Sequence, residues 1–304
     1  MGLGLAALGR PAYINIGHAS DLAGNTAVEW MERATHAVLD VAWARGVRYF
    51  DVARSYGKAE AFLAAWLERR RFKPGDLAVG SKWGYTYTAD WRIDASVHEV
   101  KDLSADTLRR QLAETRDLLG SHLSLYQIHS ATLESGVLDD PEVRDELQRL
   151  RGDGVAIGLT VTGPNQAETI RHAVEVGGFD TVQATWNLLE QSAGWALAAA
   201  HRAGLGVIIK EAVANGRLTA RGDVPELIEA ARDSGTSPDV LALAAVLAQD
   251  WVDVVLSGAA TLEELESNLS AEAVKVPDVV FERLSVVRED PATYWDKRAA
   301  LPWN

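Results

Sequence analysis

Short apolar runs rich in β-branched residues alternate with longer stretches rich in Ala, Leu, Glu and Arg along almost the whole sequence. Strand-sized runs that alternate with helix-sized stretches predict a parallel sheet whose strands are joined by crossover helices. The first strand is the least defined, because residues 3–8 could equally be a tail that leads into residues 13–16. The eight expected strands comprise residues 3–8, 47–51, 77–82, 123–129, 156–161, 181–186, 207–210 and 252–256.

Helix signals fall between these strands. Gly46 is placed to end the helix that follows residue 28, and Ser104 is placed to cap the helix that begins near residue 106. Beyond the last strand we expect a helix over residues 278–288 and an irregular tail that holds Trp295 and Trp303. The helices expected between the strands cover residues 28–45, 60–70, 106–119, 141–151, 166–176, 193–203, 240–249 and 262–270.

The number of strands decides the fold class. A chain of 304 residues fits either one large α/β barrel or two ordinary domains. No linker rich in Pro, Gly or Ser divides the sequence, and eight strands with intervening helices close more naturally into one barrel than into two sheets. We therefore predict one domain over residues 1–304, an α/β fold of the (β/α)8 TIM-barrel class with a C-terminal extension.

Composition excludes several kinds of function. Asp and Glu total 43 against 30 Lys and Arg, and the formal net charge of −13 opposes binding to nucleic acid or to anionic membranes. The sequence has no apolar run long enough to span a membrane and no secretion signal at its start, so we expect a cytoplasmic location. Cysteine is absent, and the 7 histidines are scattered, so we predict no metal site. The sequence does not indicate an oligomeric state.

Polar residues end several of the predicted strands. Asp51, Lys82 and His129 each close an apolar run, and Tyr56 follows Asp51 by five residues. Catalytic residues of (β/α)8 barrels lie at the carboxyl ends of the strands, so these four side chains are candidates for an active site. Taken singly, each has a structural explanation: a helix cap for Asp51, a solvated rim position for Lys82, a hydrogen-bonded core position for His129 and packing for Tyr56.

Their combination has a chemical rationale. Asp51 and Lys82 on neighbouring strands would form an ion pair, which makes a buried lysine acceptable. We expect the Lys82 cation to lower the pKa of Tyr56, because a phenol with a pKa of about 10 is a poor proton shuttle at neutral pH.

Three segments resemble the catalytic signatures of the aldo-keto reductase family, in the family's order. They are residues 50–57 (Phe-Asp-Val-Ala-Arg-Ser-Tyr-Gly), 81–84 (Ser-Lys-Trp-Gly) and 125–130 (Leu-Tyr-Gln-Ile-His-Ser). The similarity extends from about residue 3 to about residue 271. Further matching segments are residues 157–160, 182–187, 215–218 and 257–268.

The resemblance implies an oxidoreductase that reduces an aldehyde or ketone with NADPH or NADH. Tyr56 would protonate the carbonyl oxygen, Asp51 and Lys82 would tune the phenol, and His129 would orient the carbonyl. The family's cofactor contacts map to Thr160 and Gln183 for the nicotinamide amide, Gly216, Arg217 and Leu218 for the pyrophosphate, and Gly258, Ala259, Glu264 and Asn268 for the adenosine end.

Three departures from the family pattern concern the cofactor. Lys210 stands where many members have an aromatic residue that stacks on the nicotinamide, and Val161 after Thr160 replaces the asparagine of the usual Ser-Asn pair. Glu264 stands where a residue that binds the 2′-phosphate is usual. A glutamate would repel a phosphate dianion, so the family default of NADPH is in doubt and Glu264 favours NADH or low selectivity.

The substrate is expected to be a small carbonyl compound that an aromatic wall can hold. The segment 85–101 is long and carries Tyr85 and Trp91, while Trp83 and Trp186 end strands. We therefore expect Trp83, Tyr85, Trp91 and Trp186 to line the substrate pocket.

Two other functions remain open from the residues alone. A Schiff-base aldolase could use Lys82 or Lys210, because both lysines end barrel strands and an amine there can attack a carbonyl. A cofactor-retaining binding subunit without catalytic activity would show the same nucleotide site and no turnover.

Overall fold

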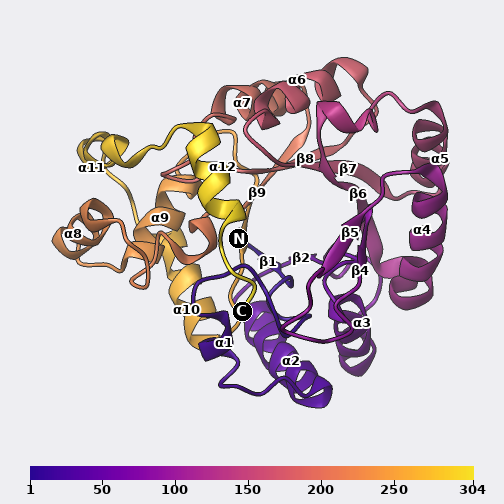
Figure 1. The fold of residues 1–304 in the computed structure, drawn as a ribbon, viewed down its shortest axis with the longest axis horizontal. Coiled ribbons are helices and arrows are strands. Elements are labelled where there is room, and N and C mark those ends of the chain that lie inside the picture. Colours follow the sequence, from indigo (N-terminus) through magenta and orange to yellow (C-terminus); the bar gives the residue numbers. More distant parts are fainter.

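The computed structural model describes residues 1–304 and consists of a closed barrel of eight parallel strands surrounded by helices (Figure 1). This architecture confirms the predicted (β/α)8 fold class. Going round the barrel, the strands follow the order β1, β2, β3, β6, β7, β8, β9 and β10, and β10 pairs with β1 to close it. Their bounds are β1 Gly2–Gly4, β2 Tyr49–Asp51, β3 Ala78–Trp83, β6 Leu123–Ala131, β7 Ala156–Val161, β8 Thr181–Thr185, β9 Gly206–Lys210 and β10 Val254–Ser257.

The main helices connect consecutive barrel strands and form the outer layer in Figure 1. Ser104 caps α4 as expected, because its side chain accepts a hydrogen bond from the Thr107 amide. Asp140 caps α5 in the same way, with Pro141 at the first helical position. The helices that follow barrel strands are α2 Val28–Ala44, α3 Ala59–Arg70, α4 Ala105–Leu119, α5 Pro141–Gly152, α6 Gln166–Val176, α7 Gly194–Arg202, α9 Pro238–Leu247 and α10 Leu262–Ser270.

Several shorter elements lie in the connections outside the barrel sheet. The segment after β3, expected to be a long loop, contains the antiparallel strands β4 Tyr85–Tyr87 and β5 Glu99–Lys101. Two further helices, α1 His18–Asp21 and α8 Pro225–Asp233, lie in the connections after β1 and β9. Short 3-10 turns occupy Gly120–His122, Leu133–Ser135, Ala214–Gly216, Ala271–Ala273 and Ser285–Val287.

The C-terminal extension is more regular than expected. The helix predicted over residues 278–288 is α11 Asp278–Leu284 followed by a 3-10 turn, and the predicted irregular tail contains helix α12 Pro291–Ala299. Asp290 caps α12 by accepting a hydrogen bond from the Thr293 amide at 3.2 Å, and Pro291 occupies the first turn. Asp-Pro is a helix-start signal that was present in the sequence. In Figure 1, α12 lies beside β9, to the left of the barrel opening.

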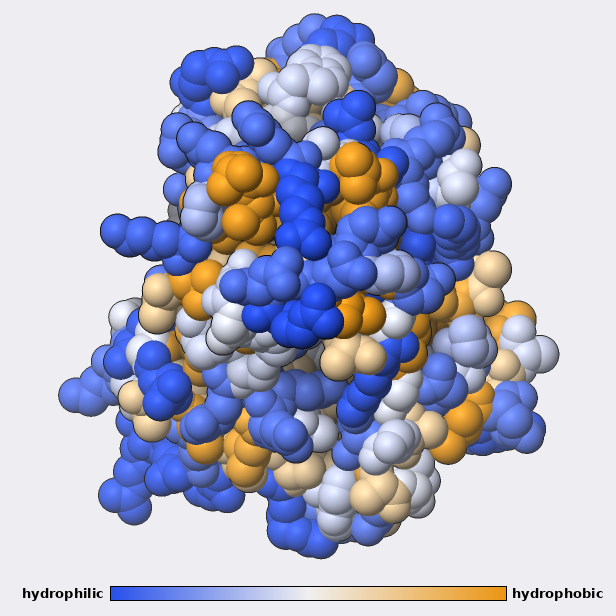
Figure 2. All heavy atoms as spheres, turned by 90° about the vertical axis from the view of Figure 1, so that its left-hand side faces the viewer, coloured by the Kyte–Doolittle hydropathy of each residue, from blue (hydrophilic) through white to orange (hydrophobic).

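The core has two main parts. The larger lies between the barrel strands and the surrounding helices, and the smaller lies beneath α8, α9, α11 and α12 and includes Tyr294 and Trp295. Through this second cluster the C-terminal extension packs against the barrel. Figure 2 shows the face that carries α8 and α11, where hydrophobic side chains form separate patches among hydrophilic ones. None of the helices combines the length and the hydrophobicity that crossing a membrane requires.

Candidate active site

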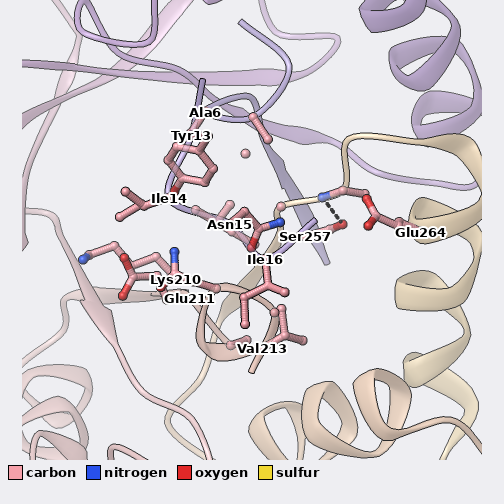
Figure 3. Close-up of a pocket in the computed structure, with 18 of the residues that line it drawn as sticks. Ala6, Tyr13, Ile14, Asn15, Ile16, Lys210, Glu211, Val213, Ser257 and Glu264 are labelled. Carbon is pink, nitrogen blue, oxygen red and sulfur yellow. Dashed lines mark hydrogen bonds between the residues drawn. The ribbon is translucent and has the colours of Figure 1, made fainter. Parts of the chain in front are cut away.

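A cavity of about 740 Å³ opens at the carboxyl ends of the barrel strands. Its walls come from the connection after β1, from the ends of several strands, and from the segments that follow β9 and β10. Tyr56, His129 and Lys210 lie at its wall together with Glu264. In Figure 3, Lys210 and Glu211 lie on one side of this cavity, Glu264 lies on the other, and Asn15 and Ile16 lie between them.

Asp51 and Lys82 form the expected ion pair on neighbouring strands β2 and β3. Both residues are at most 2% exposed. The Lys82 ammonium also donates to the carbonyl oxygen of Val52 at 2.9 Å. Burial lowers the pKa of Lys82, and the negative charge of Asp51 opposes that shift. The burial of the Lys82 charge is therefore compensated by its ion pair with Asp51 and its hydrogen bond to Val52.

Asp51 also receives hydrogen bonds that the sequence did not indicate. Its Oδ2 accepts from the Tyr49 hydroxyl at 2.9 Å, from Gln183 Nε2 at 3.0 Å and from Gln127 Nε2 at 3.3 Å. In addition to its ion pair with Lys82, the carboxylate thus accepts hydrogen bonds from side chains of its own strand β2 and of β6 and β8. Such a network fixes the position of Asp51 and, through it, that of Lys82.

Tyr56 lies beside the other three predicted catalytic residues. The Lys82 Nζ is 4.6 Å from the centre of the Tyr56 ring, and the His129 ring centre is 5.5 Å from it. Burial raises the pKa of Tyr56 well above its ordinary value, and the charge of Asp51 raises it further. The expectation that Lys82 lowers this pKa is wrong for the structure, because Asp51 neutralises Lys82 and burial outweighs the nearby cations. The phenol is consequently protonated at neutral pH.

His129 is a neutral imidazole at the cavity wall. Its pKa is lowered well below the usual value by burial and then by the cations Lys82, Lys210, Arg10 and Lys101. Its Nδ1 is buried without a hydrogen-bond partner, and the Tyr85 ring packs edge-on against it with 4.9 Å between centres. The residue lies within β6, which continues two residues past the predicted end, with Ser130 in a left-handed conformation at φ 59°.

Arg10 is a site residue that the sequence did not reveal. Its guanidinium carbon lies 5.1 Å from the centre of the Tyr56 ring, 4.9 Å from Tyr13 and 4.8 Å from Trp303. Its Nη1 donates to the Ser55 carbonyl at 3.1 Å and to Glu99 at 3.0 Å. The residue belongs to the segment after β1, and nothing in its local sequence distinguishes it from an exposed arginine.

A second charged group lies at the end of β9. Glu211, at φ 55°, accepts from Arg298 of α12 through Nε, at 2.9 and 3.0 Å to its two oxygens, and from the Thr185 hydroxyl at 3.0 Å. The neighbouring Lys210 donates only to the Thr185 hydroxyl, at 3.2 Å, and has no carboxylate within ion-pair distance. Burial lowers the pKa of Lys210 to about 8, although Glu211 raises it.

The predicted cofactor residues divide into two groups. Those that line the cavity are Gln183, Lys210, Gly216, Gly258, Ala259, Glu264 and Asn268. Three others do not line it, which corrects their expected placement. The Thr160 hydroxyl accepts from the Ser130 amide at 2.7 Å, Arg217 is engaged by Glu289 at 2.7 Å, and Leu218 is fully buried in the cluster beneath α8 and α9.

Of the four aromatic residues expected in the substrate pocket, only Tyr85 lines the cavity. Trp83 follows Lys82 on β3, and because alternate residues of a strand face opposite sides, its side chain lies in the core between barrel and helices. Trp186 packs against Trp251 in the same layer, with 5.5 Å between ring centres. Trp91 donates to the Thr26 carbonyl at 2.6 Å and packs on Phe62. Trp303 of the tail lines the cavity instead.

The opposite end of the cavity is acidic. Glu264 Oε2 accepts from the Ala260 amide at 2.9 Å, and its Oε1 lies 3.5 Å from Arg221 Nη1. Arg221 is in turn bound to Asp21 of α1, at 2.5 and 2.9 Å. Burial raises the pKa of Glu264. The one arginine at this end is therefore already engaged by carboxylates.

The barrel and the cluster of phenol, ammonium, carboxylate and imidazole at its carboxyl end define the class of protein as a (β/α)8 oxidoreductase. The profile of the Aldo/keto reductase family matches residues 15–289. The chain therefore belongs to the aldo/keto reductase family, as its three signature segments indicate.

Two curated relatives are oxidoreductases by name. The chain is 24% identical to an uncharacterized oxidoreductase of Bacillus subtilis (strain 168) over 264 residues, which covers 77% of this chain and 81% of that protein. It is 26% identical to a D-threo-aldose 1-dehydrogenase of Pseudomonas sp. over 199 residues, which covers 59% of each chain.

Solved structures agree with the fold. The holo form of an aldo-keto reductase from Bacillus halodurans superposes with a TM-score of 0.73 at 20% identity, over 95% of this chain and 92% of that one. A glycerol dehydrogenase from Gluconobacter oxydans gives a TM-score of 0.68 at 22% identity, over 94% and 90% of the two chains.

Proposed function

We propose that this oxidoreductase reduces an aldehyde or ketone to an alcohol with a nicotinamide cofactor and that Tyr56 donates the proton. The observation that carries the proposal is the placement of a protonated, partly buried Tyr56 at the cavity wall between Lys82 and His129. These three residues and Asp51 come from the barrel strands β2, β3 and β6 and from the segment after β2, so only the fold brings them together.

The cavity fits a nicotinamide nucleotide. Its volume lies in the range of sites for molecules of that size. Asn215 Oδ1 is buried at the cavity without a hydrogen-bond partner, and a Cβ added to Gly258 would meet no other atom. Gln183, Asn215, Ser257, Gly258 and Asn268 would hold the cofactor, and a bound nicotinamide would supply the hydride for the carbonyl carbon.

The side chains then have separate roles. His129, neutral because its pKa is low, donates a hydrogen bond to the carbonyl oxygen and orients it. Tyr56 holds a proton at its hydroxyl and gives it to the same oxygen as negative charge develops there. Arg10 lies against the tyrosine ring, 5.1 Å from its centre, and its charge favours the phenolate that results, whereas the charge of Lys82, 4.6 Å from that centre, is offset by Asp51. Asp51 keeps Lys82 charged in the buried site.

The preference for NADH remains part of the proposal. Glu264 lines the acidic end of the cavity, and Arg221 beside it is bound by Asp21. A 2′-phosphate at this end would meet carboxylates and no free cation, so we expect NADH to bind more tightly than NADPH.

The aldolase alternative receives less support. Lys82 is ion-paired and buried, so its amine would have to leave Asp51 and lose a proton before it could attack a carbonyl. Lys210 has the low pKa that a Schiff-base lysine needs, but Tyr56 and the remainder of the cavity would then have no role. Borohydride trapping of an enzyme–substrate adduct would favour the aldolase.

The decisive experiment follows cofactor oxidation at ~340 nm with a panel of aldehydes and ketones. We expect Tyr56→Phe to lower kcat by about 100-fold or more while the Kd for the cofactor stays nearly unchanged, because the variant lacks the proton donor only. Equal activity of the two proteins would refute the role of Tyr56. Tight cofactor binding without turnover of any substrate in the panel would favour a binding subunit.

A further inference from the structure

Lys210 is a cation at the cavity wall without an anionic partner. Its Nζ donates to the Thr185 hydroxyl at 3.2 Å and faces the Trp295 ring at 5.8 Å. The adjacent Glu211 is turned toward Arg298, which holds both of its oxygens. Since the charges of Glu211 and Arg298 offset each other, the charge of Lys210 remains to act on whatever occupies the cavity.

The charge of Lys210 also acts on His129, which is part of the proposed active site. Four cations act on His129, namely Lys82, Lys210, Arg10 and Lys101. Lys82 and Arg10 are ion-paired to Asp51 and Glu99, whereas Lys101 donates to the Ser130 carbonyl oxygen and, like Lys210, makes no ion pair. Lys210 is the unpaired cation among them that lines the cavity. Lys210 therefore adds an unpaired positive charge to the potential at a group that reacts beside His129.

A hydride donor has to approach the carbonyl carbon to about 3 to 3.5 Å, so its ring lies in this potential whatever its orientation. The nicotinamide ring is neutral when reduced and carries one positive charge when oxidised. The rest of the cofactor, including its phosphates, is identical in the two forms. A change in the ratio of their affinities when one charge is removed thus reports the contribution of that charge at the ring.

We propose that Lys210 makes the cavity discriminate between the two redox states of the cofactor, so that the reduced form binds more tightly than the oxidised form. This inference rests on the proposed function, because it requires a nicotinamide cofactor in this cavity. A single unpaired charge in a partly buried site is expected to change the ratio of the two dissociation constants by about tenfold.

The test measures the Kd of NADH and of NAD⁺ by tryptophan-fluorescence quenching and calorimetry. In the wild type we expect NADH to bind about tenfold more tightly. Lys210→Met removes the charge and keeps an unbranched side chain, so its NAD⁺ affinity should rise and the ratio should fall toward one. Lys210→Arg keeps the charge and should keep the ratio. Circular dichroism of both variants checks that they are folded.

ADP-ribose separates this role from a phosphate-binding role, because it carries the pyrophosphate but no nicotinamide. Its affinity should be the same in the wild type and in Lys210→Met. A ratio that Lys210→Met leaves unchanged, or a parallel loss of affinity for ADP-ribose and NADH, would overturn the inference. Equal wild-type affinities for NADH and NAD⁺ would overturn it while leaving the proposed function intact. Failure to bind any of these nucleotides, and NADPH as well, would overturn both.

The discrimination should also depend on pH. Lys210, whose pKa is about 8, is charged at neutral pH and neutral at about pH 10. The wild-type ratio should therefore fall as pH rises, whereas Lys210→Arg should hold its ratio. The charged groups that act on Lys210 are Glu211, Arg298, Lys82 and Asp51. Any pH dependence that persists in Lys210→Met arises from other titratable groups near the site, among them Lys82 and Lys101.

Discussion

Arg298 and Glu211 form an ion pair that joins the C-terminal helix α12 to the end of barrel strand β9. The Arg298 Nε lies 2.9 and 3.0 Å from the two carboxylate oxygens. Glu211 is 7% exposed in this pair and Arg298 is 24% exposed. The pair therefore connects the C-terminal extension to the cavity wall, and its loss would leave a buried carboxylate with fewer partners.

We expect Arg298→Ala to lower the free energy of unfolding by roughly 3 kcal/mol, because removing one member of a buried pair leaves the other uncompensated. Urea unfolding followed by circular dichroism measures the change. The control is Arg232→Ala, an arginine that is 78% exposed and 3.8 Å from Asp233, for which the change should be within about 0.5 kcal/mol. Similar small losses in both variants would contradict the structural role of Arg298.

Acid stability should depend on Glu211. Burial raises the pKa of this carboxyl, but Arg298 and Lys210 together lower it to about 2 in the folded protein, below the value of 4.5 for a free glutamate. The unfolded state therefore binds a proton first as pH falls, and the stability that Glu211 contributes above pH 4.5 is lost as pH falls toward 2. The free energy of unfolding measured against pH should fall less steeply in this window for Glu211→Gln than for the wild type. Parallel curves would show that Glu211 does not contribute.

Reversing the charge at the acidic end should change cofactor preference. Glu264→Arg is expected to raise the affinity for NADPH relative to NADH by about tenfold or more, because an attraction to the 2′-phosphate replaces a repulsion. Titration of both cofactors into both proteins measures the ratio. Glu266→Arg is the matched control, since this exposed glutamate lies on the same helix and does not line the cavity. Tighter NADPH than NADH binding in the wild type would contradict the expected preference.

Trp83 should affect stability more than substrate choice. The side chain is fully buried in the main core, so Trp83→Ala is expected to cost about 3 to 5 kcal/mol of the free energy of unfolding. Trp303→Ala removes an aromatic group from the cavity wall and should change KM values across a carbonyl panel with a smaller loss of stability. Chemical unfolding and steady-state kinetics of both variants separate the two effects. A large change in KM with little loss of stability in Trp83→Ala would instead place Trp83 in the substrate site.

The sequence alone determined the order and approximate bounds of the barrel strands and of the main helices that follow them, but not β4, β5, α8 or α12. Local periodicity and helix-end residues carry that information, and several bounds, such as those of β7 and α6, match residue for residue. It also indicated Asp51, Tyr56, Lys82 and His129, because a polar residue that ends an apolar strand is visible in one dimension. The assignment of residues 1–304 to one domain remains a prediction.

Only the tertiary structure decided which other side chains join these four. Arg10 meets the Tyr56 ring, and Arg298 meets Glu211 from 87 residues further along the chain. The tertiary structure also decided that Trp83 faces the core and that burial, more than Lys82, sets the pKa of Tyr56. Burial and electrostatic potential depend on the distances between residues that are remote in sequence, and closing the barrel is what fixes those distances.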